Sequence, residues 1–276
     1  MSTIARGTGL VLYEKTEKVA TITLNRPDKL NTLDENVYSE LDAALSDAER
    51  DRTVRAIVIT GAGRCFSAGS YIKGPRSKGV LEEWEKRDSV SDRQFRLWQV
   101  PKPIVAAVHG HCIGRGLELA LWCDIVIAAE DAQFGQPEVR SGSFVATIVP
   151  WLMGPQHAKL FMLSGDLIGA REAERFGLVA RVVPSGEAQT AAFALAQRLA
   201  HVPPVTARSI KRWISMIYEE RGIRSMQELG TRVSSLLKFL TPAESDTEDL
   251  AKIRSEEGLK AFLQARDRPF KSERNG

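Results

Sequence analysis

The chain has 276 residues, of which 43% are hydrophobic and 26% are charged, the composition of an ordinary globular protein. Its longest apolar runs fall well short of the roughly 20 residues that a membrane-spanning helix needs, so we expect no membrane protein. The formal net charge is +3 and no basic run is interleaved with aromatic residues, which argues against a nucleic-acid-binding protein.

The N-terminal segment MSTIARGTGLVLYEKTEK lacks the apolar core of a signal peptide, so we expect a cytoplasmic protein. The three cysteines, Cys65, Cys112 and Cys123, have neither the spacing of a zinc site nor that of a redox pair. We interpret them as small buried hydrophobic residues in a reducing compartment.

Short runs rich in β-branched residues predict strands, and most of these runs are apolar on both faces, as in strands covered on two sides. Between residues 33 and 45 a leucine or valine recurs at every fourth position, which predicts a helix that Thr32 or Asp34 could cap. Residues 170–177 predict a short helix that ends at Gly177. Strands that alternate with helices predict an α/β fold. The predicted strands are 19–24, 55–60, 103–108, 124–129 and 178–183.

Strand signals disappear after Pro184. Residues 186–265 carry helical periodicity, interrupted by prolines in the segments HVPP and LTPAESD. We therefore predict an α/β core over residues 1–200 and a helical region over residues 201–276.

Several familiar motifs are incomplete. The segment TGAGRCF follows a predicted strand but lacks the third glycine of a dinucleotide-binding fingerprint, and no Walker-type loop occurs. The segment CFSAG has a cysteine where the serine-hydrolase elbow needs its first glycine. His109 and His111 have no further ligands at metal-site spacing, so we predict a structural pair and no metal site.

Two glycine-rich turns, residues 66–73 and 112–120, each follow a predicted strand and lead into a predicted helix. Glycine lets the backbone approach a ligand closely, and the first N–H groups of a helix have no partner within the helix. Two such N–H groups that converge would form an oxyanion hole for an enolate or a tetrahedral oxyanion. Two tight turns with nothing bound fit the spacing equally well.

Two carboxylates follow the second turn. Glu118 precedes an apolar run, and Glu138 comes 20 residues later, after a predicted helix and strand that could return it to the same cleft. Two carboxyl groups beside one water could divide the work of acid and base if their environments separate their pKa values. The alternative is a helix first-turn acid and a surface acid without a shared role.

Four ordered motifs resemble the crotonase, or enoyl-CoA hydratase/isomerase, superfamily, and the resemblance runs nearly end to end. Together they are specific for the superfamily but much less so for the reaction, which varies within it. The motifs are VATITLNRPDKLNTL, GRCFSAGSYIK, HGHCIGRGLELALWCDIVIAAEDAQFGQPEV and SEEGLKAFLQARDRPFK.

This resemblance implies a ββα spiral core that binds acyl-CoA and a helical C-terminal region that mediates trimerisation, often as a dimer of trimers. The thioester oxygen would lie between the backbone N–H groups of Ser70 and Arg115. The two glutamates of the family's hydratases fall on Glu118 and Glu138, and the family's isomerases typically keep only the second. The resemblance therefore favours hydration of a 2-enoyl-CoA, with no cofactor apart from the coenzyme A of the substrate.

The resemblance also suggests residues that bind the substrate and its coenzyme A. They are Lys29, Leu30, Ala68, Tyr71, Ile72, Lys73, Phe270 and Lys271, the last two reaching the nucleotide of a neighbouring subunit. A solvated surface lysine is an equally good interpretation of each lysine.

The sequence departs from the family pattern in three places. Tyr71 stands where most members have aspartate, and Arg115 stands where glycine is usual. The Arg115 side chain could bind a phosphate or a substrate carboxylate, but we favour solvent or a subunit contact. Residues 140–155 replace a glycine-rich helix start. Within that segment, Phe144 and Trp151 could reshape the acyl pocket or belong to the core.

These departures leave other functions open. One is another reaction of the superfamily, such as double-bond isomerisation, thioester hydrolysis or a lyase reaction, with the same oxyanion hole and Glu138. The other is a non-catalytic acyl-CoA-binding scaffold, although a scaffold has no need of paired acids.

Overall fold

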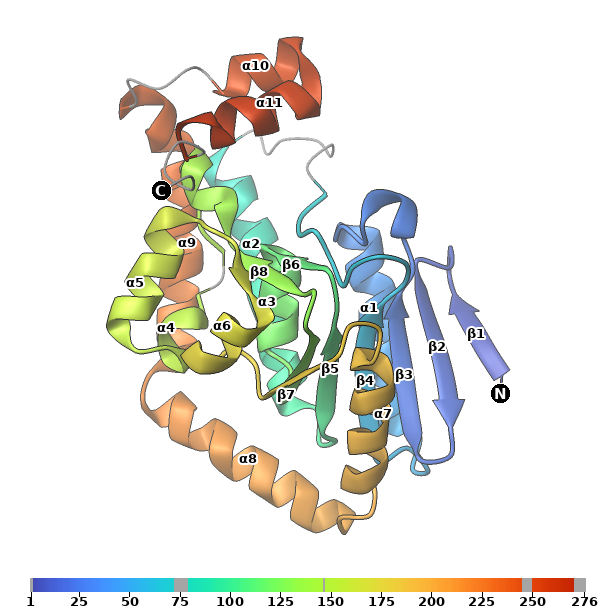
Figure 1. Cartoon of the computed structure of the whole chain (residues 1–276). Coiled ribbons are helices and arrows are strands. Elements are labelled where there is room, and N and C mark those ends of the chain that lie inside the picture. The colour runs from blue at the N-terminus through green and yellow to red at the C-terminus, as the bar shows by residue number, and fades with distance from the viewer. Residues whose placement is uncertain (1, 72–78, 146, 245–249, 271–276) are drawn as a thin grey trace.

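A central sheet of mostly parallel strands organises the fold. The computed structural model describes residues 2–71, 79–145, 147–244 and 250–270. Within them the sheet has the order β1-β2-β3-β4-β5-β7-β10, and a smaller sheet, β6-β8-β9, accompanies it (Figure 1). The strands are β1 (Ser2–Arg6), β2 (Val11–Thr16), β3 (Val19–Leu24), β4 (Ala56–Gly61), β5 (Ile104–Val108), β6 (His111–Ile113), β7 (Ile125–Ala129), β8 (Gln133–Gly135), β9 (Ile168–Gly169) and β10 (Arg181–Val183).

Helices cover the central sheet and extend the chain beyond it (Figure 1). No helix in the described ranges combines the length and the hydropathy needed to cross a membrane. The α-helices are α1 (Glu35–Arg50), α2 (Val80–Gln99), α3 (Arg115–Leu121), α4 (Val149–Leu152), α5 (Pro155–Ser164), α6 (Ala170–Phe176), α7 (Ala188–Leu199), α8 (Pro204–Glu220), α9 (Ile223–Glu244), α10 (Leu250–Glu256) and α11 (Gly258–Asp267). The 3-10 helices are η1 (Pro27–Lys29), η2 (Pro137–Ser141) and η3 (Arg268–Phe270).

Burial on both faces explains why the parallel strands are apolar throughout. Strands β3, β4, β5, β7 and β10 run parallel to their neighbours in this series. In β4, Ile57 and Ile59 join the core that includes α1, whereas Val58 packs in a second cluster with the alanines of α7. Alternate side chains therefore enter different cores, and the α/β prediction is confirmed.

The predicted strands agree with the structure except at the last one. Four of them begin and end within one residue of the observed strands, but the predicted run 178–183 contains a strand only over Arg181–Val183. Leu178 is buried, but its N–H donates to Ala173 O and so closes the end of α6. The sequence analysis missed β1, β2 and the small sheet, whose strands have at most three residues.

The structure contains the predicted N-cap at the start of α1 and the predicted glycine at the end of α6. Asp34, not Thr32, is the N-cap of α1, and its side chain accepts a hydrogen bond of 3.1 Å from Val37 N. Helix α6 ends at Gly177, which has φ +89°. At this position glycine avoids the steric cost of the left-handed conformation.

Only helices follow β10 in the described residues, and they do not form a separate body. Helix α7 covers the sheet, α8 crosses the lower end of the molecule, and α9 returns to pack along α2 (Figure 1). Residues of the C-terminal region therefore approach those of the α/β part. The division between a core and a helical region at about residue 200 stays a prediction.

One buried ammonium group connects α8 to the core. Lys211 Nζ donates to Leu97 O at 2.9 Å, to Lys102 O at 3.1 Å and to Asp124 Oδ2 at 2.7 Å. The Lys211 side chain is only 8% exposed. Asp124 Oδ2 also accepts from Ile104 N at the start of β5, so this carboxylate links the helix to the sheet.

We predict that Lys211→Met lowers the free energy of unfolding by about 3 kcal/mol, because it leaves the Asp124 carboxylate without its buried cation. This value is near the low end of the range for a broken buried ion pair, since Asp124 is partly exposed. Urea titration measures this loss. Arg212→Met on the same helix is the matched control, since Arg212 is half exposed where it pairs with Glu219, and it should cost less than about 1 kcal/mol. Equal losses in the two variants would contradict the assignment.

Candidate active site

Two glycine turns pack side by side at the centre of the site. Ser67 N donates to His111 O at 2.9 Å, and Ile113 N donates to Ser67 O at 3.0 Å. Gly69 has φ +93°, and a Cβ placed on it would lie 2.8 Å from Ile113 O. Only glycine fits both this conformation and this close approach.

The two predicted oxyanion donors belong to these adjacent turns. Leu33 N donates to Gly69 O, and Tyr71 N donates to Leu33 O. The N–H of Ser70, which lies between these two residues, therefore points away from Leu33. Arg115 is the first residue of α3, where a backbone N–H has no partner within the helix. In the described part of the chain neither N–H has a hydrogen-bond acceptor. The structure thus brings two unpaired donors together at one place.

Glu118 lies in α3 with 2% of its surface exposed, inside a network of polar side chains. Its Oε1 accepts from Thr147 Oγ1 at 3.3 Å and from Gln227 Nε2 at 3.2 Å. Gln227 Nε2 also donates to Gln94 Oε1 at 2.7 Å. Burial raises the pKa of Glu118, while the charge of Arg115 and these hydrogen bonds oppose the rise. The carboxylate is therefore desolvated but held in one orientation.

Glu138 lies in η2, and its carboxyl group rests on Gly114 at the start of α3. A Cβ placed on Gly114 would lie only 1.8 Å from Glu138 Oε1, and Gly114 has φ +53°. Burial raises the pKa of Glu138, and the nearby charge of Glu118 adds to the rise. Glu138 Oε2 is buried without a hydrogen-bond partner among the described residues. The two glutamates thus meet around the second glycine turn.

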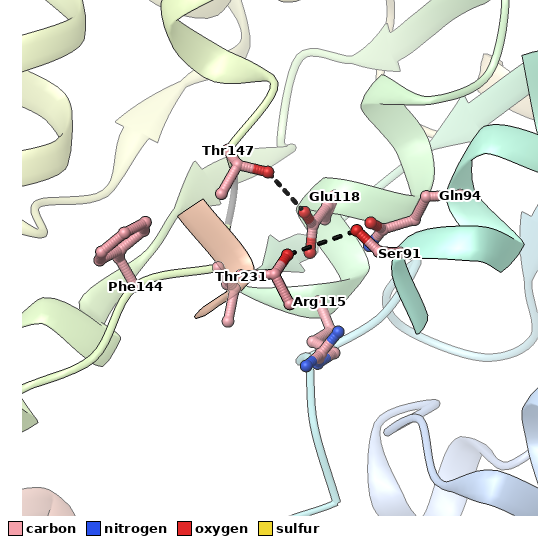
Figure 2. A pocket seen from close by; sticks show the side chains of 8 residues that line it. Ser91, Gln94, Arg115, Glu118, Phe144, Thr147 and Thr231 are labelled. Carbon is pink, nitrogen blue, oxygen red and sulfur yellow. Dashed lines mark hydrogen bonds between the residues drawn. The ribbon is translucent and has the colours of Figure 1, made fainter. Parts of the chain in front are cut away.

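A small pocket that opens to solvent lies over Glu118 (Figure 2), and its enclosed part has room for about one water molecule. Its walls come from α2, α3, α9 and the segment after Glu138, which contributes Phe144 and Thr147. Phe144 therefore shapes the pocket, whereas Trp151 packs against the core, which separates the two alternatives left by the sequence. The lining residues are Ser91, Gln94, Arg115, Glu118, Phe144, Val145, Thr147 and Thr231.

The Arg115 side chain is only partly exposed in this chain, and whether it contacts another subunit stays a prediction. Arg115 lines this pocket and faces the hydroxyl group of Tyr38. Burial raises the pKa of Tyr38 to about 12, although the Arg115 charge opposes the rise. Tyr38 is thus a neutral neighbour, which helps to keep the guanidinium at the pocket wall.

The polar residues of α2 and α9 were not predicted from the sequence. Ser91 and Gln94 are three positions apart on α2, and Gln227 and Thr231 are four apart on α9; all four are buried. The Ser91 and Thr231 hydroxyl groups lie 3.3 Å apart and join the two helices. The sequence signal that could have indicated them is the recurrence of polar residues at helical spacing on a helix face that is otherwise packed.

Some of the residues expected to bind coenzyme A gather beside the first turn. Ala68 N donates to Leu30 O at 2.9 Å. Lys29 Nζ lies 5.2 Å from the centre of the Tyr71 ring, and the Arg26 guanidinium carbon lies 4.4 Å from it. Two cations thus surround Tyr71 at this edge of the site.

The remaining expected contacts are not part of this group. Phe270 stacks instead under the Arg140 guanidinium, whose carbon is 4.3 Å from the ring centre. Ile72, Lys73 and Lys271 lie outside the described residues.

Comparisons with known proteins identify the family. The family model described as enoyl-CoA hydratase/isomerase matches residues 14–273, so the chain belongs to this family. It is 32% identical over 267 residues to "Enoyl-CoA hydratase, mitochondrial" of Pongo abelii, covering 94% of this chain and 86% of that relative. It is 37% identical over 211 residues to "Short-chain-enoyl-CoA hydratase" of Clostridium acetobutylicum, covering 74% and 80%.

Solved structures agree with this assignment. The chain superimposes on the crystal structure of an enoyl-CoA hydratase/isomerase from Xanthobacter autotrophicus Py2 with a TM-score of 0.86 and 33% identity, covering 95% of this chain and 99% of that chain. The fold is thus the crotonase-like fold that the sequence motifs predict.

We predict that Gly114→Ala lowers turnover of a 2-enoyl-CoA on the order of 100-fold, because the added methyl group displaces the Glu138 carboxylate. Spectrophotometric turnover assays measure the loss, and circular dichroism checks the fold. Gly154→Ala is the matched control, since a Cβ there meets nothing within 4 Å. A Gly114→Ala enzyme as active as the control would separate Glu138 from the reaction.

Proposed function

We propose that the protein is an enoyl-CoA hydratase, which adds water across the double bond of a 2-enoyl-CoA thioester. The observation that carries the proposal is that two glutamates with raised pKa values meet at the same glycine turn as two unpaired N–H groups. Relatives named enoyl-CoA hydratase at 32% and 37% identity support it.

The oxyanion donors act on the thioester carbonyl. The N–H groups of Ser70 and Arg115 donate to its oxygen, which becomes negatively charged when water attacks the β-carbon. Donors that are already in place stabilise this enolate without rearrangement, and losing one such donor typically costs about 3–4 kcal/mol of transition-state stabilisation. Since both donors are backbone groups, Arg115 serves here as well as glycine.

The two carboxyl groups handle the proton of the attacking water. Its oxygen bonds to the β-carbon while the Glu138 carboxylate takes one proton, and the π electrons move into the enolate. The α-carbon then receives a proton from a carboxyl group, so the balance is one water added. We assign this return to Glu138, because its Oε2 has no partner among the described residues, whereas three neighbours orient Glu118, which holds the water.

Other reactions of the family use part of this arrangement. A double-bond isomerase, a thioester hydrolase or a lyase would need the oxyanion donors and Glu138 alone. Product analysis on a 2-enoyl-CoA and a 3-enoyl-CoA separates these reactions from hydration. A non-catalytic acyl-CoA-binding scaffold would convert neither substrate.

We further propose that the protein assembles as a trimer or a dimer of trimers. The exposed face of α8 supports assembly, because large apolar side chains recur on it at helical spacing and Trp213 is 65% exposed. Ile210, Trp213, Ile214 and Ile217 form this stripe.

Several sequence-based expectations remain predictions. They are the absence of any cofactor besides the coenzyme A of the substrate, the absence of a nucleic-acid partner, and a cytoplasmic location. The name of the Pongo abelii relative places that protein in mitochondria, so location needs its own experiment.

We predict that Glu138→Gln lowers kcat by about 10²–10⁴-fold, the usual contribution of a general acid–base group, with little change in KM. Loss of the enoyl-thioester absorbance measures turnover, and Glu118→Ala should also be impaired. Glu130→Gln is the control, because Glu130 is exposed and pairs with Arg171. Turnover by Glu138→Gln at the wild-type rate would rule out its role.

We predict that kcat/KM falls as the pH is lowered, with a midpoint above the ordinary glutamate pKa of 4.5. The attacking water needs an ionised carboxylate, and burial raises the pKa of both acids, so the ionised form is lost at a higher pH than usual. The measured limb belongs to the pair. Gln227→Leu removes a hydrogen bond that lowers the Glu118 pKa, so it should move the midpoint upward.

The control for this shift is Gln197→Leu, since Gln197 bonds to Glu17 on the exposed surface. A midpoint that stays in place with Gln227→Leu would show that Glu118 does not contribute to the titration.

A further inference from the structure

The walls of the pocket over Glu118 are unusually polar for a site that would hold a hydrocarbon chain. Among the lining residues that the structure describes, only Phe144 and Val145 are apolar, and the others carry hydroxyl, amide or charged groups. Acyl pockets are normally lined by apolar side chains, because a polar group covered by a hydrocarbon loses its hydrogen bonds to water. The pocket therefore suits an acyl group that itself carries polar atoms.

Arg115 is the cation of this pocket, and it has no carboxylate partner. Among the described residues, no acidic side chain lies within 4.0 Å of its guanidinium. Other partly buried arginines differ: Arg93 contacts Glu35 and Asp42, and Arg140 contacts two aspartates. Figure 2 shows the Arg115 guanidinium apart from the Glu118 carboxylate.

Within the ranges that the structure describes, the neighbours of Arg115 form no ion pair with its guanidinium. Tyr38 is buried and stays neutral at physiological pH, so it supplies no counter-charge. Glu118 and Glu138 lie near enough for the Arg115 charge to oppose the rise of their pKa values, but burial raises the pKa of both.

Ser91 and Thr231 line the same pocket and hydrogen bond to each other, which uses one hydroxyl proton and leaves the other to be donated to a ligand. A planar guanidinium beside a hydroxyl donor matches the needs of a carboxylate.

The position of Arg115 connects this cation to the acyl group. Its backbone N–H is one of the proposed donors to the thioester oxygen, and its side chain lines the pocket that contains Glu118. A thioester bound at that N–H thus has its acyl chain next to the guanidinium.

We propose that the preferred substrate is a 2-enoyl-CoA whose acyl chain carries a carboxylate, and that Arg115 pairs with this carboxylate. The inference rests on the proposed hydratase function and names its substrate class. The side chain of Arg115 would select the substrate by its charge, while its backbone N–H would take part in the reaction with every acyl group.

The test compares substrates that differ only in charge. The probes are 4-carboxybut-2-enoyl-CoA and 5-carboxypent-2-enoyl-CoA, each with its isosteric carboxamide analogue, and but-2-enoyl-CoA as the simple substrate. The ratio of kcat/KM for carboxylate to carboxamide isolates the effect of the charge, because the oxyanion step is common to both and cancels. We expect this ratio to be about 10 to 100 in the wild type at one chain length at least.

Arg115→Gln should bring this ratio to about 1 or below, and Arg115→Lys should retain part of it. Arg171→Gln is the control and should leave the ratio unchanged, since Arg171 is exposed and pairs with Glu130. If Arg115→Gln has too little turnover, calorimetric binding of the saturated analogues, 4-carboxybutanoyl-CoA and its carboxamide, gives the same ratio without reaction.

Three results would overturn the inference. They are a wild-type ratio at or below 1 for both chain lengths, a ratio that Arg115→Gln does not change, and an equal loss for every thioester, which would assign Arg115 to a phosphate of coenzyme A. Hydration of but-2-enoyl-CoA with no preference for the carboxylate would refute this inference alone. Failure to hydrate any of the probes would refute the hydratase function itself.

Discussion

The contact between Glu138 and Gly114 is the constraint on which the site depends. The carboxyl group lies so close to the Gly114 backbone that any side chain there would displace it, and the φ of +53° disfavours other residues as well. The same glycine begins α3, which holds Glu118 and presents the Arg115 N–H. One missing side chain therefore sets the relative positions of the two acids and of one unpaired backbone N–H, and the packing of Gly69 against Ile113 places the second N–H nearby.

The C-terminal region completes the site from a distance in sequence. Helix α9 packs along α2 and brings Gln227 to Glu118, 109 residues away in the chain. Lys211 binds the preceding helix, α8, to the core. These hydrogen bonds thereby fix the position at which α9 begins. The helices that carry the exposed apolar stripe and the buried amide are thus consecutive in the chain.

Physical chemistry explains which features the sequence predicts. The parallel strands are predictable because burial on both faces requires uninterrupted apolar runs, and Gly177 and Asp34 mark helix ends by local backbone chemistry. The two glutamates that follow the glycine turns are conspicuous in the sequence, because burying a carboxylate in an apolar segment is costly unless it has a partner or a function. Patterns over neighbouring residues cannot show which distant helix packs on Glu118, so Gln227 and Thr231 were missed. The contact between Arg115 and Tyr38 could not be predicted either, because the two residues are far apart in the sequence and nothing local indicates it.

Arg115 joins two kinds of group in a single residue. Its peptide N–H is shared by all twenty amino acids except proline, whereas its guanidinium is unique to arginine. A substitution at this position therefore changes the charge at the pocket wall while the backbone N–H stays in place. The side chain and the main chain of one residue can in this way change independently of each other.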